Sequence, residues 1–459
     1  MDINVKQVPA PTPDNSGKPI MLSDATIERR KQKVLELMHE ANLSSLVIYA
    51  DKEHGSNFEY LTGFIPRFEE SLQILNKDGS STLVLGNENY NKVKFARVES
   101  EGIHCPLFSL PNQPMGGFRP LEHYLRQVNI DTSGKVGVVG WKLLSNDYHD
   151  FHQNFDIPAF IIDALHKVVG KEKLVNATQI YMHPGKGARA TNNANEIARY
   201  EYGASLASDA VLSAMDALKE DVKETEAGNL LNRDGQYQTV VTISSFGERF
   251  INGNLYPTDR RLERGDKVAL TVAYKGGLSS RSGYAVSNLD ELEEVDPGYL
   301  TEVVVPYFQA YNWWLRNIEI GIKGGDFYDE FAAYYPQDQY GWELCPGHLT
   351  ADEEWLSSPF YKDSDAIVQS GNIFQVDFIP IQEGHYGVSA ESTIALADDT
   401  LRQEIQTDYP DLWKRIEARR VYLKENLNID LKPEVLPLAS TLGYYRPFLL
   451  NPEMALVIG

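Results

Sequence analysis

Hydrophobic and polar residues alternate with two periods along this chain, and each period predicts one kind of element. Apolar residues at helical spacing predict a helix that Ser23 or Asp24 begins and Asn42 ends. The same spacing predicts further helices, over 195–218, 299–318, 326–333 and 408–426. Short β-branched runs between turn residues predict strands, at 46–50, 71–76, 82–86, 136–140 and 237–246. Asp78-Gly79 predicts that the second and third of these strands form a hairpin.

Two apolar runs near the end of the chain each contain a carboxylate at a position where the alternation of apolar and polar residues predicts a buried apolar side chain. Asp377 lies in the run 371–380, and Glu391 lies in the run 387–396. A carboxylate in such a strand needs a cation, a metal or a hydrogen-bond partner, or else it stays protonated. Pro346-Gly347-His348 precedes both runs and supplies an imidazole. An ordinary buried ion pair and a structural histidine are the alternatives to a functional site.

Changes in composition along the chain predict its organisation. The proline-rich segment 1–22 reads as a flexible or surface-draped arm, and a stretch of mixed charge that contains Gly185-Lys186-Gly187 follows residue 167. We therefore expect a first domain over 23–175 and a second over 176–459, which ends in an apolar extension, 436–459.

Charge and cysteine content exclude several classes of function. The net charge of −22 over 459 residues argues against a nucleic-acid partner, because binding phosphates needs a basic face. Cys105 and Cys345 form neither a disulfide framework nor a zinc-binding spacing, which favours a reducing cytoplasm. No apolar run is long enough to span a membrane, and the first residues lack the pattern of a signal peptide.

The order of these runs resembles the second half of the pita-bread superfamily, which contains methionine aminopeptidase, prolidase, aminopeptidase P and creatinase. In its metallopeptidases two Asp, one His and two Glu bind two divalent metals, and His348, Asp377 and Glu391 fall on the last three positions. The resemblance implies the α+β fold class, with a C-terminal pita-bread domain in which helices cover a curved antiparallel sheet. The segment Tyr60–Phe64 resembles the smaller α/β domain that precedes it in creatinases and prolidases, and such proteins generally form homodimers.

The first two ligand positions depart from the family pattern. The segment 265–281 follows the family framework with one residue fewer and places Thr271 and Arg281 where both aspartates are expected. This exchange removes about two negative charges and adds one positive charge where cations would lie. We therefore predict a degenerate metal site without a cofactor, in which the guanidinium of Arg281 pairs with Asp377 or Glu391.

The resemblance also implies residues that contact the substrate. The run 257–266 is the most family-like part of the chain, and relatives place a histidine just ahead of it, where this chain has Asn254. Tyr256 and Trp355 are expected to line the pocket. Trp355 stands seven residues after His348, where metallopeptidase relatives have a second histidine.

Three functions follow from these residues. The first is a metal-independent, creatinase-like or Xaa-Pro-peptidase-like hydrolase that cleaves a C–N bond of a small peptide-like or amidino substrate, with His348 as general acid or base. The second is an aminopeptidase or Xaa-Pro dipeptidase that needs a divalent metal such as Mn, Co or Zn, held by His348, Asp377 and Glu391. The third is a non-catalytic protein that binds a peptide or small molecule in the same cleft.

Overall fold

The computed structural model describes residues 2–13, 17–113, 117, 119–144, 151–249, 251–253 and 256–459, which form two compact units. One unit consists of residues 22–190, which run past the expected boundary at residue 175. The other combines residues 1–21 with residues 191–459. Segments from both ends of the chain therefore build the second unit.

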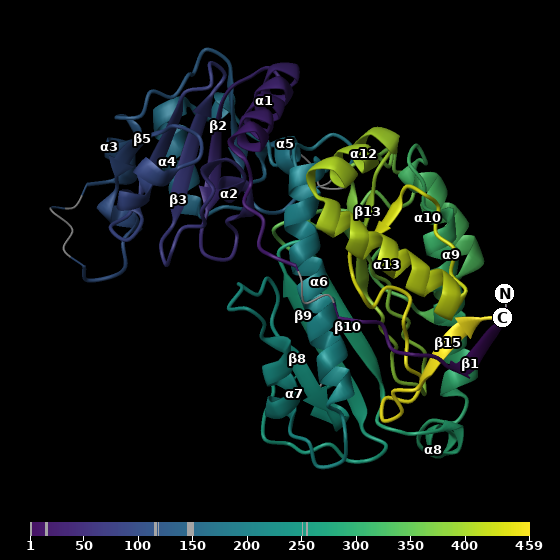
Figure 1. Ribbon diagram of the computed structural model, residues 1–459. Helices are drawn as coiled ribbons and strands as arrows, with labels where there is room; N and C mark the ends of the chain where they lie inside the picture. Colours follow the sequence, from purple (N-terminus) through teal and green to yellow (C-terminus); the bar gives the residue numbers. More distant parts are fainter. Residues whose placement is uncertain are drawn as a thin grey trace. The chain divides into compact units, whose positions relative to one another are not determined.

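A six-stranded mixed sheet with strand order β5-β4-β3-β2-β6-β7 forms the centre of the first unit. The strands are β2 Leu43–Ala50, β3 Ser71–Asn76, β4 Ser81–Leu85, β5 Glu101–His104, β6 Lys135–Val139 and β7 Leu174–Asn176. The helices of this unit are α1 Asp24–Glu40, α2 Ser56–Thr62, α3 Leu121–Leu125, α4 Ala159–Val169 and α5 Gln179–Met182 (Figure 1). The predicted hairpin is confirmed, since β3 pairs with β4 in antiparallel register. Ser23 caps α1 by accepting a hydrogen bond from the backbone of Thr26, as the sequence predicts.

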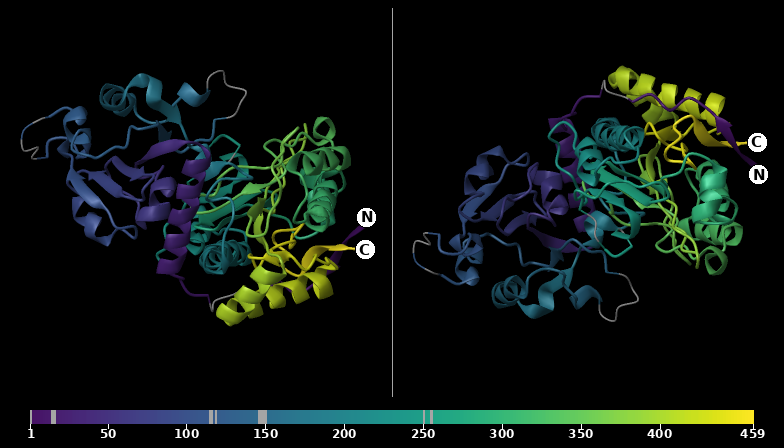
Figure 2. Two further views of the ribbon diagram at one scale, coloured as in Figure 1. Left: turned by 90° about the horizontal axis from the view of Figure 1, so that it is seen from above. Right: turned by 90° about the horizontal axis from the view of Figure 1, so that it is seen from below.

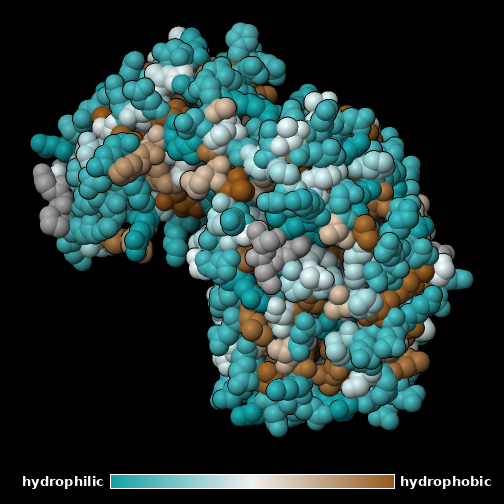
Figure 3. Space-filling model, in the orientation of Figure 1, coloured by the Kyte–Doolittle hydropathy of each residue, from teal (hydrophilic) through white to brown (hydrophobic). Residues whose placement is uncertain are grey.

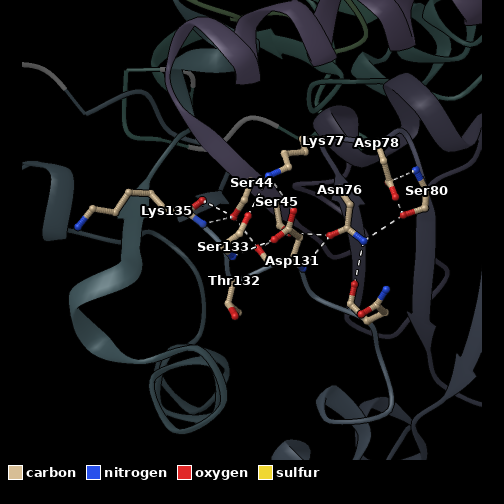
Figure 4. A network of polar contacts seen from close by, with 12 residues as sticks. Ser44, Ser45, Asn76, Lys77, Asp78, Ser80, Asp131, Thr132, Ser133 and Lys135 are labelled. Atoms are coloured by element: carbon tan, nitrogen blue, oxygen red, sulfur yellow. Dashed lines mark hydrogen bonds and ion pairs between the residues drawn. The ribbon is translucent and has the colours of Figure 1, made fainter.

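A polar network at one end of this sheet fixes the segment that leads into β6 (Figure 4). The carbonyl oxygen of the Asn76 side chain accepts a hydrogen bond from the Ser45 hydroxyl at 2.6 Å, and its amide donates to the Asn129 carbonyl at 2.8 Å. The carbonyl of Asp131 accepts from the hydroxyls of both Ser44 and Ser45. These bonds tie residues 129–131 to the ends of β2 and β3, so the polar groups of that loop are satisfied.

In the second unit, a long helix packs against an antiparallel three-stranded sheet. The sheet has the order β10-β9-β8, from β8 Ile243–Phe246, β9 Lys267–Tyr274 and β10 Gly277–Tyr284. The helix α6, Ala194–Asp216, contacts β9 and β10 along its length (Figure 1). A Cβ on Gly203 of α6 would lie 1.9 Å from the carbonyl oxygen of Lys275, so only glycine permits this approach.

A four-stranded antiparallel sheet completes the core of the second unit. Its order is β11-β12-β13-β14, from β11 His348–Leu349, β12 Ile373–Val376, β13 Ser392–Leu396 and β14 Val435–Pro437. Trp314 packs edge-on against Phe374 of β12, with ring centroids 6.2 Å apart, so helix α9 (Val305–Asn317) covers this sheet. The remaining helices are α7 Glu224–Leu231, α8 Leu289–Val295, α10 Gly324–Tyr334, α11 Gln337–Tyr340, α12 Asp399–Asp408 and α13 Pro410–Leu427.

The two chain ends form a small sheet that the sequence did not predict. Strand β1 (Ile3–Gln7) pairs antiparallel with β15 (Met454–Ile458), and both lie side by side in Figures 1 and 2. The expectation of a flexible arm over 1–22 is therefore wrong for Ile3–Gln7. Within the extension 436–459, β15 contributes four buried residues to the second unit.

Other differences from the predicted elements are local. The strand expected over 237–246 is reduced to Ile243–Phe246, and the helix expected over 299–318 begins with a π-helical turn, Leu300–Val304. Hydrophilic side chains dominate the face shown in Figure 3. Among the described residues, no helix combines the length and the apolar character that crossing a bilayer needs.

Candidate active site

The register of three neighbouring strands brings the predicted site residues onto one face. Val376 pairs with Ser392 in the antiparallel β12–β13 ladder, and the next residues outward are Asp377 and Glu391. His348 of β11 pairs with Gln375, two residues before Asp377. Because side chains two apart on a strand share a face, His348, Asp377 and Glu391 converge. The structure thus brings together the three residues that the sequence singles out.

The glycine before His348 is required by the backbone. Gly347 has φ = 99°, a conformation that residues with a side chain rarely adopt. Its amide donates to the carbonyl of Asp377 at 2.9 Å, and the indole of Trp314 donates to the carbonyl of Pro346 at 2.7 Å. These two bonds set the position from which the His348 side chain reaches the carboxylates.

The imidazole of His348 is fully buried and faces two carboxylates. Its Nε2 atom lies 2.9 Å from Oε1 of Glu354 and 3.6 Å from Oδ2 of Asp377. Both contacts are ion pairs when the ring is protonated, but neither Nε2 nor Oδ1 of Asp377 has a hydrogen-bond partner. The other ring nitrogen, Nδ1, lies 3.2 Å from the carbonyl of Leu349. Two buried polar atoms of the centre therefore stay unsatisfied.

Glu354 is the member of this centre that the sequence analysis missed. It stands in a loop after β11, and its side chain is 18% exposed. The next residue, Trp355, stacks on the His348 ring with centroids 4.0 Å apart and is 40% exposed. The spacing of seven residues after His348 identified this loop in the sequence, but only Trp355, and not Glu354, was expected to contribute to the site.

The pKa of His348 reflects a balance between burial and its acidic neighbours. Burial is the largest single influence and acts to lower the pKa. Glu354 and Asp377 together outweigh burial and raise the pKa of His348 to about 10. Without an added cation, the imidazole is therefore protonated at neutral pH and partly balances the two carboxylates.

The surroundings of Glu391 favour its protonated form. Burial raises the pKa of Glu391 well above its ordinary value, and the adjacent charges of Asp377 and Glu354 raise it further. A hydrogen bond with Ser280 acts in the lowering direction but is weaker. Glu391 therefore holds its proton more tightly than an ordinary carboxyl group, and in its protonated form it can bond to Asp377 as a carboxylic acid.

The β9–β10 register overturns the expected role of Arg281. Thr271 pairs with Ser280, so these two side chains share a face, and Arg281 points to the opposite one. Ser280 reaches Glu391, whereas the Arg281 guanidinium donates to backbone carbonyls, those of Ser280, Glu391, Thr441 and Tyr444. It makes no ion pair with a described carboxylate, so the predicted pairing with Asp377 or Glu391 is wrong. Because the segment 265–281 is one residue shorter than in the family, the sequence alone could not predict which face of β10 the Arg281 side chain occupies.

Arg281 instead holds the chain after β14 in place. We expect Arg281→Met to lower the free energy of unfolding by roughly 1–3 kcal/mol, because several buried carbonyl oxygens lose their donor. Urea denaturation measures this change. If Arg281→Met left stability unchanged and strengthened cation binding at His348, the guanidinium would balance the carboxylates after all.

Of the other expected substrate contacts, Tyr256 is not brought to this centre. Tyr256 is 68% exposed, and its carbonyl accepts a hydrogen bond from Arg249 rather than from any residue of the His348 centre. Asn254 lies outside the described residues. Thr271 is half-buried on β9, opposite Ser280.

A separate cavity of about 520 Å³ lies in the same unit and does not have His348 in its lining. Its charged residues are already paired: Arg260 with Asp266 at 2.7 Å, Lys267 with Glu248 at 2.8 Å, and His385 with Asp296 at 2.6 Å. The family-like run 257–266 therefore includes an internal ion pair and stabilises a turn. Burial raises the pKa of Asp266 more strongly than Arg260 lowers it.

No protein-family model matches the sequence, and no curated protein does. Among solved structures, an Xaa-Pro dipeptidase from Bacillus anthracis is similar, with TM-score 0.60 and 15% identity, over 82% of this chain and 96% of that one. A prolidase from Pyrococcus horikoshii OT3 has TM-score 0.60 and 17% identity, over 80% and 95% of the two chains. An X-Pro aminopeptidase from Thermotoga maritima MSB8 has TM-score 0.60 and 15% identity, over 80% and 95%.

At these identities the likeness concerns the fold. The compared chains are matched over nearly their whole length, so the similarity includes both units. Mixed α/β structure in the first unit and antiparallel sheets in the second agree with the fold class expected from the sequence. This chain has the two-domain pita-bread fold of prolidases and Xaa-Pro aminopeptidases.

Proposed function

We propose that this protein is a hydrolase that cleaves a C–N bond in a small peptide-like substrate, at the centre formed by His348, Glu354, Asp377 and Glu391. One observation carries the proposal: three carboxyl groups and an imidazole meet in a buried place, and two of their polar atoms have no hydrogen-bond partner. Strongly shifted pKa values at such a cluster favour acid–base chemistry over a purely structural role. The similar solved structures are named as dipeptidases, prolidases and aminopeptidases, which favours a peptide-like substrate.

Each residue has a role in this proposal. The raised pKa of Glu391 favours its protonated form, which would transfer a proton to the departing nitrogen, since an amine leaves more easily when protonated. His348 and Asp377 orient the reacting groups, and Glu354 sets the charge on the imidazole. Trp355 stacks on His348 and restrains its ring, while its exposed face can contact the substrate.

The residues present do not fit the two-metal arrangement of the superfamily. Thr271 and Ser280 lie on the site face of the β9–β10 hairpin and supply hydroxyl groups. Two dications held close together need bridging carboxylates to balance their repulsion. By contrast, His348, Glu354 and Asp377 fit a single divalent ion, which would supply a Lewis acid or an activated water. The expectation of metal independence rested on the loss of two aspartates and on the gain of Arg281. Because the Arg281 guanidinium points elsewhere, we favour the metal-dependent alternative, with Glu354 as a ligand in place of Glu391.

A substrate panel tests the proposed function. The protein is incubated with Xaa-Pro dipeptides, longer Xaa-Pro peptides and amidino amino acids, each with a chelator or with Mn²⁺, Co²⁺ or Zn²⁺. Mass spectrometry should find two products from cleavage at the C–N bond of one class. A ligand that binds in a calorimetric titration and is never cleaved would identify a non-catalytic binding protein instead.

The expected homodimer and the expected cytoplasmic location stay predictions.

Replacing Glu391 with glutamine should separate chemistry from folding. Glutamine has the shape of the protonated carboxylic acid, so we expect the free energy of unfolding to change by less than about 1 kcal/mol. The amide cannot give up the proton, so kcat should fall about 10²-fold. Steady-state kinetics and urea denaturation measure the two effects. The exposed Glu383→Gln serves as the control, and equal activity of both variants would remove Glu391 from the reaction.

A further inference from the structure

Two neighbouring segments of the first unit, 62–68 and 89–98, combine cations with aromatic rings and contain no acidic residue. The backbone amide of Arg97 donates to the Thr62 carbonyl at 3.0 Å, and the Asn89 side chain bonds to the backbone of Arg67, so the two segments lie side by side. They hold four of the 43 Lys and Arg of the chain and none of its 65 Asp and Glu. On a chain with a net charge of −22, this surface reverses the sign of the charge locally.

Three aromatic rings of these segments lie at the surface. Phe95 is 70% exposed, Phe68 is 53% exposed and Tyr90 is 39% exposed. The Arg67 guanidinium lies 4.8 Å from the centre of the Phe68 ring, and the Lys94 ammonium lies 5.0 Å from the centre of the Phe95 ring. Exposed apolar groups that gather in one place mark interaction sites, whereas single ones are ordinary. The basic–aromatic patch consists of Arg67, Phe68, Tyr90, Lys92, Lys94 and Phe95.

The backbone holds the Phe68 ring in its exposed position. Phe68 has φ = 67°, in the left-handed region that bulky residues rarely adopt. The buried Asn89 side chain accepts from the Arg67 amide at 2.8 Å and donates to the Arg67 carbonyl at 3.0 Å. Asn89 also donates to the buried carboxylate of Glu69 at 2.9 Å. These buried bonds impose the strained conformation, so the ring is fixed before a partner binds, and less entropy is lost on binding.

The cations of the patch face one another without a carboxylate between them. Lys92 donates to the side-chain oxygen of Asn89 at 2.9 Å, and Arg67 and Lys94 lie against aromatic rings. Burial is the largest influence that lowers the pKa of Lys92, and the charge of Arg67 lowers it further. Like charges held together in this way leave a positive potential, which a carboxylate from another molecule would balance.

The charge of the whole chain decides among the anionic partners. Nucleic acids and anionic membranes are extended polyanions, so they would also approach the acidic surface around the patch and be repelled by it. A short peptide segment with a few carboxylates covers the patch alone, and more distant charges are screened beyond about 8 Å at physiological salt. The apolar rings favour the same choice, because Arg and aromatic side chains dominate the binding energy of protein interfaces.

We propose that the basic–aromatic patch is a docking site for a short acidic segment of a partner protein, in which apolar side chains accompany the carboxylates. Arg67 and Lys94 pair with the carboxylates, and the rings of Phe68 and Phe95 cover the apolar side chains. The patch lies in the unit that does not contain His348, so this inference and the proposed hydrolase are tested by separate experiments.

A phage library of short random peptides tests the proposal, with the full-length chain as the bait. The enriched peptides should be rich in Asp and Glu and should contain Leu, Phe or Trp. In fluorescence polarisation, a labelled enriched peptide should bind more weakly as NaCl is added, because the charges are screened. The double variants Arg67→Gln/Lys94→Gln and Phe68→Ser/Phe95→Ser should each lose about tenfold in affinity or more.

Matched substitutions in the same unit control for general changes of the surface. Lys171→Gln removes an exposed cation and Phe160→Ser removes a ring that is 42% exposed, both outside the patch, and each should bind the peptide as the unaltered protein does. Circular dichroism establishes that every variant is folded. The two double variants alter different chemistry, so either one tests the site if the other misfolds.

Four results would overturn the inference. They are a selection without enrichment of acidic peptides, a peptide affinity that neither double variant changes, and patch-dependent binding of oligothymidylate or phosphatidylserine vesicles that is tighter than that of the peptides. The fourth is a homodimer in sedimentation velocity that either double variant converts to monomers, since the patch would then be an interface between two copies of this chain.

Discussion

Replacing His348 with alanine should reduce kcat by about 10²–10⁴-fold. Nε2 of His348 lies between Glu354 and Asp377, so its loss removes the nitrogen ligand and leaves the two carboxylates without their balancing group. The variant should still bind the substrate, because Glu354, Asp377, Glu391 and the exposed Trp355 all remain, although Trp355 loses the ring on which it stacks. Steady-state kinetics with the substrate found in the panel, together with calorimetric binding, measure both quantities.

A matched control separates His348 from its neighbour. Trp355→Phe keeps a ring against the imidazole and should change kcat by only a few-fold. Both variants are assayed with excess Mn²⁺ and with a chelator, so that weakened metal binding is not mistaken for lost chemistry. A His348→Ala protein with more than a tenth of the original kcat would exclude His348 from the reaction.

Replacing Glu201 with alanine is expected to lower the free energy of unfolding by about 3–5 kcal/mol. Glu201 lies on α6 with a fully buried carboxylate that accepts hydrogen bonds at 2.6 Å from both Arg415 and Arg419 of α13. Its removal leaves two largely buried guanidinium groups without their anion. The exposed Glu417→Ala on α13 is the control and should change stability by less than about 0.5 kcal/mol.

The same ion pair gives stability a defined dependence on pH. Burial is the largest influence on Glu201 and raises its pKa, but Arg419 and Arg415 together outweigh burial and lower the pKa below the ordinary 4.5. The contribution of the pair is therefore complete above that pH and is lost as the pH falls through the lowered value. Urea denaturation of Glu201→Gln should show a smaller acid-induced loss than the unaltered protein. An equal loss would show that other carboxylates cause it.

The sequence could predict the elements whose signals are local. Helix α6 follows from regular apolar spacing, and the β3–β4 hairpin follows from Asp78-Gly79 between two apolar runs. Asp377 and Glu391 were identifiable because a carboxylate interrupts an apolar strand. By contrast, β1 pairs with β15 at the other end of the chain, and neither segment carries a local sign of its partner.

Two parts of the site were beyond sequence reasoning for physical reasons. A shift of one residue along β10 moves a side chain to the other face of the sheet, so the gap before Arg281 made its orientation undecidable. Glu354 lies in a loop, where no periodicity indicates direction, and only the chain path after β11 brings it to His348. Register and loop path, rather than residue type, determine which groups meet.

The stacking of Trp355 on His348 gives the centre its own optical signal. A protonated imidazole quenches the fluorescence of an indole in van der Waals contact with it, whereas a neutral ring quenches less. The emission of Trp355 therefore depends on the state of the His348 ring, 4.0 Å away. Because the indole is also 40% exposed, a small molecule that covers it changes its emission wavelength. Events at this buried centre can thus be followed by light in the unlabelled protein.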